Sequence, residues 1–293
     1  MKPDFIIIGA MKCATSTLHD QLARVQGVSM SDPKEPNYFS DADQWAKGHG
    51  WYGSLFNQMP ETDLKGESST HYTKLPTYPE CAQRVLDHLP DAKLIYVMRD
   101  PIDRIVSQYI HEWSQHVIDE GCTIDDAIRR HPMLVDYSRF SMQLQAYVER
   151  FGFGRILPVF FERLMHDPQH EFERVGRFLG ISLEMKWDEG EAKNLSAQRQ
   201  RRHPMLNAML SLRATQFIRR TLMPESLRAK IRSRWTMQDR PELSPDSIGW
   251  LHEQLNPDLH QLGDWIGRPL SCASFHEVVM QGSSPEWTDG GDA

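Results

Sequence analysis

Three short apolar runs alternate with amphipathic segments along the chain, and each apolar run predicts a β-strand. The runs are DFIIIGA at residues 4–10, KLIYVMRD at 93–100 and RILPVFFERL at 155–164. They are almost continuously apolar and rich in β-branched or aromatic residues. This pattern is typical of strands that are buried on both faces of a parallel sheet.

Segments with helical periodicity lie between and after these runs. They are STLHDQLARV at residues 16–25, ECAQRVLDHL at 80–89, PIDRIVSQYIHEW at 101–113, SRFSMQLQAYVERF at 138–151 and HEFERVGRFLGI at 170–181. Strands that alternate with helices predict βαβ units, so we expect an α/β fold with a central parallel sheet flanked by helices. We place this single domain at residues 1–275 and expect a mobile tail at residues 276–293, where the periodicity has faded.

Composition restricts the possible classes of function. The chain has 293 residues and a net charge of −7, which argues against bulk binding to nucleic acid or to an anionic membrane. No apolar stretch approaches the roughly 20 residues that span a bilayer. The first strand begins by Phe5, so we expect no signal peptide. The four cysteines are scattered without CxxC spacing, which predicts a reduced, cytoplasmic setting.

The loop after the first strand is suited to an anion. It carries Lys12 followed by three consecutive hydroxyl residues at 15–17, and a helix begins there. The free N–H groups and the dipole of a helix N-terminus attract a phosphate-like group. The order differs from the triphosphate-binding GxxxxGK[ST] loop, in which the lysine comes near the end. By itself, such a loop is as often only a capped turn.

A second strand also ends in a segment that is suited to an anion. Arg99 closes this strand, Pro101 begins the following helix, and Ser107 lies two turns into it. Arginine binds phosphate in a bidentate manner, although an RDP sequence is often only a helix start with a salt bridge. Ligands of parallel sheets bind beyond the carboxyl ends of the strands. Together, the two segments predict a ligand with two separate anionic ends.

These residues resemble the sulfotransferases that use 3′-phosphoadenosine 5′-phosphosulfate (PAPS). KCATSTL is similar to their P-loop-like phosphosulfate loop, commonly K-x-G-T-[ST]-x-L, and YVMRDPIDRIVSQY is similar to their 3′-phosphate segment. The resemblance implies that Arg99 and Ser107 bind the 3′-phosphate. It implies that the 5′ end is held by the loop residues Lys12, Cys13, Ala14, Thr15, Ser16 and Thr17. Ala14 stands where the family usually has glycine. Glycine has no Cβ and lets the backbone approach the phosphate more closely.

Two further segments resemble the heparan-sulfate-type branch of that family. DPKEPNYF at residues 32–39 is similar to K-E-x-x-[FY]-F, which implies that Glu35 is the catalytic base. GESSTHY at 66–72 resembles G-E-K-[ST]-x-x-Y, but Ser68 replaces the lysine that helps to stabilise the transferring group. His71 is the alternative base, by analogy with the aryl and steroid branch, and Glu67 is a candidate for orienting a loop.

The resemblance covers most of residues 4–270. RILPVFFERLMHDP and NPDLHQLGDWIGRPL match a later strand and the terminal helix of the family, and NLSAQRQRRHP at 194–204 resembles its loop over the nucleotide. For Arg199 in that loop, two readings remain open. It either clamps the 3′-phosphate or belongs to a solvated basic face. The strongly basic residues 199–235 have a helical pattern.

The resulting hypothesis is a sulfotransferase that transfers the sulfuryl group of PAPS to a hydroxyl or amine. The acceptor is a carbohydrate, a lipid or a small metabolite. We expect no metal, because no His, Cys or Asp cluster has metal-ligand spacing. The alternatives are a P-loop-like nucleotide kinase and a non-catalytic nucleotide-binding protein. The early lysine and the lack of a clear Mg²⁺-binding acid after a strand argue against the kinase.

Overall fold

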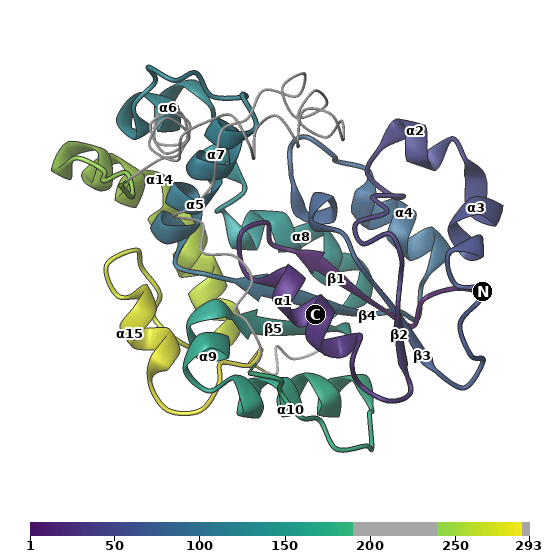
Figure 1. Ribbon diagram of the computed structural model, residues 1–293. Coiled ribbons are helices and arrows are strands. Elements are labelled where there is room, and N and C mark those ends of the chain that lie inside the picture. The colour runs from purple at the N-terminus through teal and green to yellow at the C-terminus, as the bar shows by residue number, and fades with distance from the viewer. Residues whose placement is uncertain (190–238, 289–293) are drawn as a thin grey trace, which may run out of the picture.

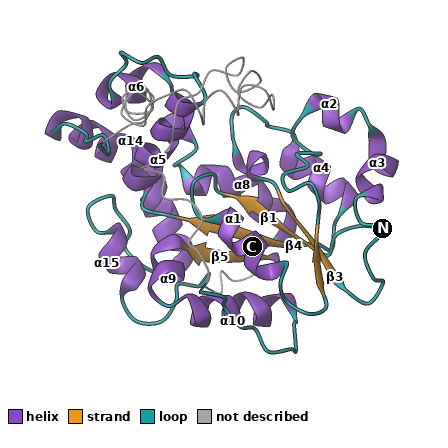
Figure 2. Ribbon diagram, viewed as in Figure 1, coloured by secondary structure: helices purple, strands orange, loops and turns teal. Residues whose placement is uncertain are grey.

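The sheet at the centre of the molecule has five strands, all parallel. The computed structural model describes residues 1–189 and 239–288, and its sheet has the order β2-β3-β1-β4-β5 (Figure 2). The strands are β1 (Phe5–Gly9), β2 (Val28–Met30), β3 (Leu64–Ser68), β4 (Lys93–Met98) and β5 (Ile156–Phe160). The three predicted strands are confirmed as β1, β4 and β5. The sequence did not predict β2 or β3.

The five predicted helices are confirmed. They are α1 (Thr15–Leu22), α4 (Cys81–His88), α5 (Pro101–Ser114), α8 (Phe140–Phe151) and α10 (Pro168–Leu179). The other described helices are α2 (Ala42–Trp45), α3 (Gly48–Ser54), α6 (Ile124–Arg130), α7 (Met133–Asp136), α9 (Phe161–His166), α14 (Pro245–Ile266) and α15 (Phe275–Met280), with 3₁₀ turns η1 (Thr70–Thr73) and η2 (Phe153–Arg155). Helix α5 begins as its sequence predicts, because Pro101 occupies the first turn and the Asp100 side chain accepts from the Asp103 N–H at 2.9 Å.

The direction of the crossovers decides which helix covers which face of the sheet. Parallel strands are joined by right-handed crossovers. The chain moves from β1 outward to β2, but from β3 and β4 it moves in the opposite direction across the sheet. Helix α1 and the pair α4 and α8 therefore lie on opposite faces. Figure 1 shows α1 in front of the strands and α8 behind them, and α8 packs against both α4 and α14.

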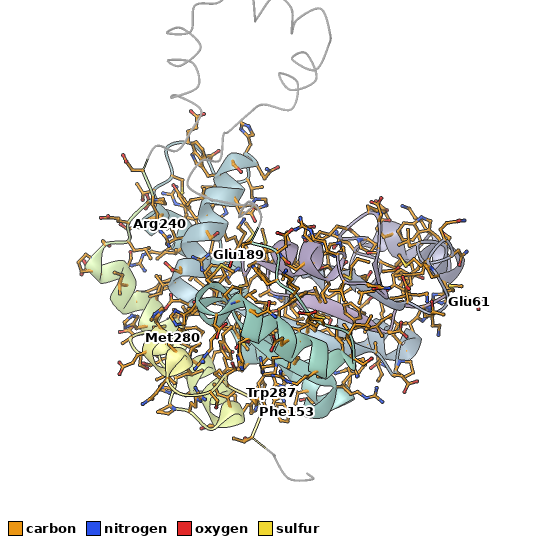
Figure 3. All side chains as sticks on the ribbon, turned by 60° about the horizontal axis from the view of Figure 1, so that its bottom comes forward. Glu61, Phe153, Glu189, Arg240, Met280 and Trp287 are labelled. Atoms are coloured by element: carbon orange, nitrogen blue, oxygen red, sulfur yellow. The ribbon has the colours of Figure 1, made fainter. Side chains whose placement is uncertain are left out.

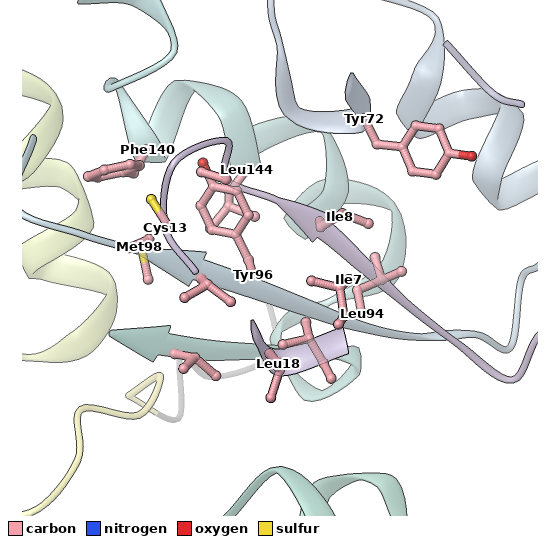
Figure 4. Close-up of a cluster of buried hydrophobic side chains, with 14 of the residues drawn as sticks. Ile7, Ile8, Cys13, Leu18, Tyr72, Leu94, Tyr96, Met98, Phe140 and Leu144 are labelled. Atoms are coloured by element: carbon pink, nitrogen blue, oxygen red, sulfur yellow. The ribbon is translucent and has the colours of Figure 1, made fainter. Parts of the chain in front are cut away.

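The core runs through the sheet and reaches the loop after β1. Tyr96 and Met98 of β4 are fully buried, and Cys13 lies near them in the same cluster (Figure 4). The ring of Tyr96 packs against that of Phe140 in α8 at a centroid distance of 6.3 Å. This packing connects the predicted anion-binding loop directly to the interior.

The described part of the C-terminal segment, residues 276–288, packs against the domain. Helix α15 covers its beginning, and the indole Nε1 of Trp287 donates to the Ile156 carbonyl at 2.6 Å. Trp287 also packs against Phe153 at a centroid distance of 5.1 Å, and Figure 3 shows the two side by side. Arg163 and Arg268 donate to several carbonyls of residues 278–283. These contacts hold residues 276–288 against the domain, and the mobility of the tail stays a prediction. A domain boundary at residue 275 stays a prediction that no measurement tests.

Three elements of the sequence hypothesis lie outside the described residues. They are the basic segment 199–235, the loop at 194–204 and Arg199 within that loop.

Candidate active site

The carboxyl ends of the strands bring four sequence segments to one edge of the sheet. All five strands are parallel, so the segments that follow them lie on the same side. Residues 10–14 follow β1, residues 31–37 follow β2, η1 follows β3, and residues 99–100 follow β4. Each segment that carries a predicted site residue within the described chain is thus at this edge.

The loop after β1 exposes the start of α1 to an anion. The helix begins after Ala14 without a side-chain cap, and its first turn contains no acidic residue. The first N–H groups of a helix have no partner within it, and this loop leaves them for a ligand. Ala14 and Lys12 adopt left-handed backbone conformations with φ of 63° and 71°. Ala14 therefore takes the conformation that glycine favours, at a cost on the order of 1 kcal/mol from its Cβ.

Cys13 contributes to this loop through its backbone, because its side chain belongs to the core. The side chain is fully buried, and its Sγ lies 3.7 Å from the Met11 carbonyl oxygen. Burial raises the pKa of the thiol to about 12, although the charges of Arg104 and Arg99 act against the shift. The thiol is therefore neutral and is no nucleophile at physiological pH.

A buried arginine of α5 supports the loop after β1. Arg104 of α5 is fully buried and donates to the carbonyls of Met11 at 3.3 Å and Leu134 at 2.8 Å. Its other donors reach Ser138 and Gln108. Burial lowers the pKa of Arg104 to about 10, so the guanidinium remains charged at pH 7. It fixes the loop after β1 against α5 and α7.

The two predicted anion sites are adjacent. Arg99 Nη1 lies 3.5 Å from the Lys12 carbonyl oxygen, and the guanidinium lies 4.3 Å from the centroid of the Phe161 ring. Asp103 accepts from Arg99 at 3.4 Å and also pairs with Arg240. The Nε atom of Arg99 is buried without a hydrogen-bond partner among the described residues. The structure thus joins the segment of Arg99 to that of Lys12, as a ligand with two anionic ends requires.

Ser107 is the second residue predicted to bind the 3′-phosphate. It lies on α5, two turns beyond Arg99, and is buried. Within the described part of the chain, its hydroxyl makes no hydrogen bond. Ser107 on α5 and Arg99 just before that helix therefore supply the hydroxyl and the guanidinium predicted for the 3′-phosphate.

Glu35 lies where the segment after β2 crosses the end of β3. Its N–H donates to the Ser68 carbonyl at 3.0 Å, and its carboxylate Oε1 accepts from Thr70 Oγ1 at 3.4 Å. The ammonium of Lys34 lies 3.8 Å from the same oxygen and also donates to Ser16 Oγ. One lysine therefore connects the candidate base to the start of α1.

His71 belongs to η1, directly after Thr70. Its ring stacks on that of Tyr78 at a centroid distance of 5.0 Å. Burial lowers its pKa to about 4, and the charge of Lys74 lowers it further. His71 is thus neutral at pH 7 but a weaker base than an ordinary histidine. The choice between Glu35 and His71 stays a prediction.

Glu67 points to the interior instead of the site. It is fully buried on β3, near Tyr52 and Tyr72. Burial raises the pKa of Glu67 to about 8, and the two tyrosine hydroxyls act against the shift. A role in orienting the surface loop, as the sequence suggested, has no support in this position.

Sequence reasoning missed three cations at this edge: Lys34, Lys74 and Arg104. Lys34 and Arg104 are inside segments that were singled out, next to the residues that drew attention. Lys74 follows the GESSTHY segment by two positions. Their spacing to Glu35 and Lys12 depends on the fold, so the local sequence holds no signal for it.

The described residues contain neither a metal-binding cluster nor a membrane-spanning helix. No cluster of three or more His, Cys, Asp or Glu side chains within residues 1–189 and 239–288 is arranged to hold a metal ion. In the same ranges, no helix is both long enough and apolar enough to cross a membrane.

Comparisons with known proteins give the chain a family. Its fold is similar to the crystal structure of a sulfotransferase from Alicyclobacillus acidocaldarius, with a TM-score of 0.66 and 23% identity over 92% of this chain and 98% of that one. Heparan sulfate glucosamine 3-O-sulfotransferase 3B1 of Mus musculus is 33% identical over 61% of this chain and 46% of its own length. Bifunctional heparan sulfate N-deacetylase/N-sulfotransferase 2 of Bos taurus is 26% identical over 74% of this chain and 28% of its own length. The chain thus spans less than half the length of these two relatives. Residues 2–263 match the model of the sulfotransferase domain, and the chain belongs to this family.

Proposed function

We propose that this protein transfers the sulfuryl group of PAPS to a hydroxyl or amine of an acceptor. One observation carries the proposal: the Arg99 guanidinium lies within 3.5 Å of the Lys12 backbone oxygen. This contact joins two anion-binding segments that are roughly 90 residues apart in the sequence. A nucleotide with a phosphate at each end of its ribose matches such a pair of sites.

The residues of the site suit three separate tasks in this reaction. Lys12 and the first N–H groups of α1 would bind the 5′ phosphosulfate and stabilise charge on the leaving phosphate. Arg99 and Ser107 would bind the 3′-phosphate. In the reaction, the sulfur–oxygen bond to the 5′-phosphate breaks while a bond from sulfur to the acceptor forms. Glu35 would accept the acceptor's proton.

We infer that the acceptor is a carbohydrate. The support comes from the names of the relatives, which describe sulfation of heparan sulfate on a glucosamine 3-hydroxyl or on nitrogen. Lipid and small-metabolite acceptors belong in the same assay as competing possibilities. Turnover of labelled PAPS with heparan-type oligosaccharides, glycolipids and small alcohols or amines separates these classes, and O- and N-sulfated products are distinguished by mass spectrometry.

The donor is tested by binding. Isothermal titration should show binding of PAPS and of the desulfated nucleotide without Mg²⁺. The variants Lys12→Ala and Arg99→Ala should each weaken binding by about 1.5–3 kcal/mol, the usual value of a charge-assisted contact. Lys93→Ala, at the opposite edge of the sheet, is the control that should bind normally. Preference for ATP with Mg²⁺ would instead support the kinase, and binding without turnover of any acceptor would support the non-catalytic alternative.

We also propose a cytoplasmic location. All four cysteines are free and buried, which supports a reducing environment. Fractionation of the native cells with an antibody to the chain is the test, and recovery from a secreted or lumenal fraction would overturn the proposal.

A further inference from the structure

The last residue of β3, Ser68, lacks the positive charge that the resemblance leads one to expect. Ser68 pairs with Ile7 of β1, and its backbone oxygen accepts from Glu35. Its side chain is fully buried. A serine hydroxyl at this point cannot stabilise the negative charge of a sulfuryl group as an ammonium would.

Lys74 lies six residues further along the chain, at the end of η1, where Glu35 is the acid that acts on it most strongly. The residue before it is anchored to β1, since Thr73 Oγ1 donates to the Ile8 carbonyl at 2.8 Å. The residue after it is anchored to α8, where Leu75 exchanges two hydrogen bonds with the Gln143 side chain, at 2.7 and 2.9 Å. The backbone of Lys74 is thus fixed next to the strand that leads into the phosphate-binding loop.

The Lys74 side chain is largely buried, and its ammonium has no polar partner in the part of the chain that the structure describes. Its relative exposure is 9%, and its ammonium lies 5.8 Å from the centroid of the Tyr137 ring. Within residues 1–189 and 239–288, this ammonium makes no hydrogen bond and no ion pair. Burying a cation without a partner is costly, so the position is typical of a group that meets an anionic ligand.

We propose that Lys74 is a catalytic residue that contacts the transferring sulfuryl group and replaces the charge missing at Ser68. The inference rests on the proposed function. As the bond from sulfur to the leaving phosphate breaks and the acceptor bond forms, Glu35 takes the acceptor proton. Lys74 keeps its own proton and stabilises the sulfuryl oxygens.

Charged groups on several elements surround Lys74. Among acids, Glu35 acts on it most strongly, followed by Glu112 of α5 and Asp41 before α2, while Arg104 of α5 opposes them. The charge of Lys74 also lowers the pKa of His71 in η1. Burial lowers the pKa of Lys74 to about 8, and Glu35 acts against this shift. The charge is therefore present below pH 8 in the free enzyme and is lost above it.

The test compares three lysine variants of the full chain. Lys74→Met removes the charge and keeps the length, Lys74→Arg keeps a charge that does not titrate, and Lys93→Met is the control. Lys93 is also partly buried near an aromatic ring, 5.6 Å from the Phe178 centroid, but lies at the opposite edge of the sheet. The measurements are kcat, KM, the pH profile of kcat/KM and the affinity for the desulfated nucleotide.

We expect Lys74→Met to lower kcat about 100-fold, with affinity for the desulfated nucleotide within about threefold of the original, because the contact is made to the sulfuryl group. The original chain should lose kcat/KM above about pH 8, because the profile reports the free enzyme. Lys74→Arg should keep measurable turnover and lose this alkaline limb, and Lys93→Met should match the original.

Near-normal kcat in Lys74→Met would overturn the inference. So would an alkaline limb that persists in Lys74→Arg, which decides the question even if Lys74→Met does not fold. A purely structural lysine would leave the pH profile unchanged in Lys74→Arg. If the original chain itself shows no turnover of PAPS with any acceptor, the proposed function fails and the failure is not specific to Lys74.

Discussion

At the scale of single residues, the site separates two candidate bases by their surroundings. Glu35 accepts from Thr70 and lies near Lys34, which reaches the phosphate-binding loop. His71 stacks on Tyr78 and has a pKa lowered to about 4. Burial thus removes the advantage that an ordinary histidine has as a base near neutral pH.

We therefore predict that Glu35→Gln lowers kcat by about 10²–10⁴-fold, the usual contribution of a general base. The amide keeps the shape of the side chain and removes its basicity. Affinity for the desulfated nucleotide should remain nearly unchanged in isothermal titration. His71→Ala is the companion variant and should be milder. Near-full turnover in Glu35→Gln together with loss in His71→Ala would assign the base to His71.

Glu67 gives a prediction about stability against pH. Burial raises its pKa from 4.5 to about 8, so between these values the folded protein binds a proton that the unfolded chain has released. The contribution of Glu67 to stability is therefore lost as the pH rises from about 4.5 to 8. Glu67→Gln should remove this loss and raise the unfolding free energy at pH 7 by about 1–3 kcal/mol. Urea titrations at pH 5 and pH 7 check it, and an equal effect at both would contradict it.

At the scale of elements, close contact between β1 and β3 depends on a glycine. A Cβ at Gly66 would lie 2.2 Å from the Phe5 ring, and both residues occupy paired positions of the two strands. Gly66→Ala should therefore lower the free energy of unfolding by about 1–3 kcal/mol, the usual cost of an overpacked core. Phe5→Leu in the same chain should restore part of the loss. Additive effects of the two substitutions in thermal unfolding would show that the predicted clash does not exist.

The strands also show what a local pattern can and cannot predict. β1, β4 and β5 are apolar and were found, whereas β3 has the sequence LKGES and was missed. Its polar side chains are buried because other segments contact them. Glu67, for example, lies near the tyrosines of α3 and η1. No hydropathy pattern contains these partners, so the strand could not be read from its own residues.

The site likewise contains residues that the sequence predicts and residues that only the fold reveals. Lys12, Glu35 and Arg99 lie in motifs whose residue types already indicate an anion or a proton transfer, and the structure brings them to one edge of the sheet. Lys74 and Arg104 acquire their positions from η1 and α5. Their contribution depends on distances between segments of the fold, and the residues next to them in the sequence do not predict these distances.

At the scale of the whole molecule, the C-terminal segment contributes to stability. Trp287 packs against Phe153 and donates to the Ile156 carbonyl in β5. Trp287→Ala should lower the unfolding free energy by about 2–4 kcal/mol, somewhat less than a fully buried tryptophan. Glu286→Ala is the control, because its side chain is mostly exposed and its ion pair with Arg174 should contribute less than about 1 kcal/mol. A free segment would leave denaturant unfolding unchanged in both variants.

The buried guanidinium of Arg104 has a consequence for how a ligand arrives. Its hydrogen bonds to the Met11 and Leu134 carbonyls fix the loop after β1 from within the protein. The conformational entropy of ordering this loop is then lost during folding and not during association. A nucleotide meets a preorganised cradle, so its binding should proceed in a single fast phase without a slow isomerisation of this loop. Arg104 thus links the folding of the interior to the kinetics of recognition at the surface.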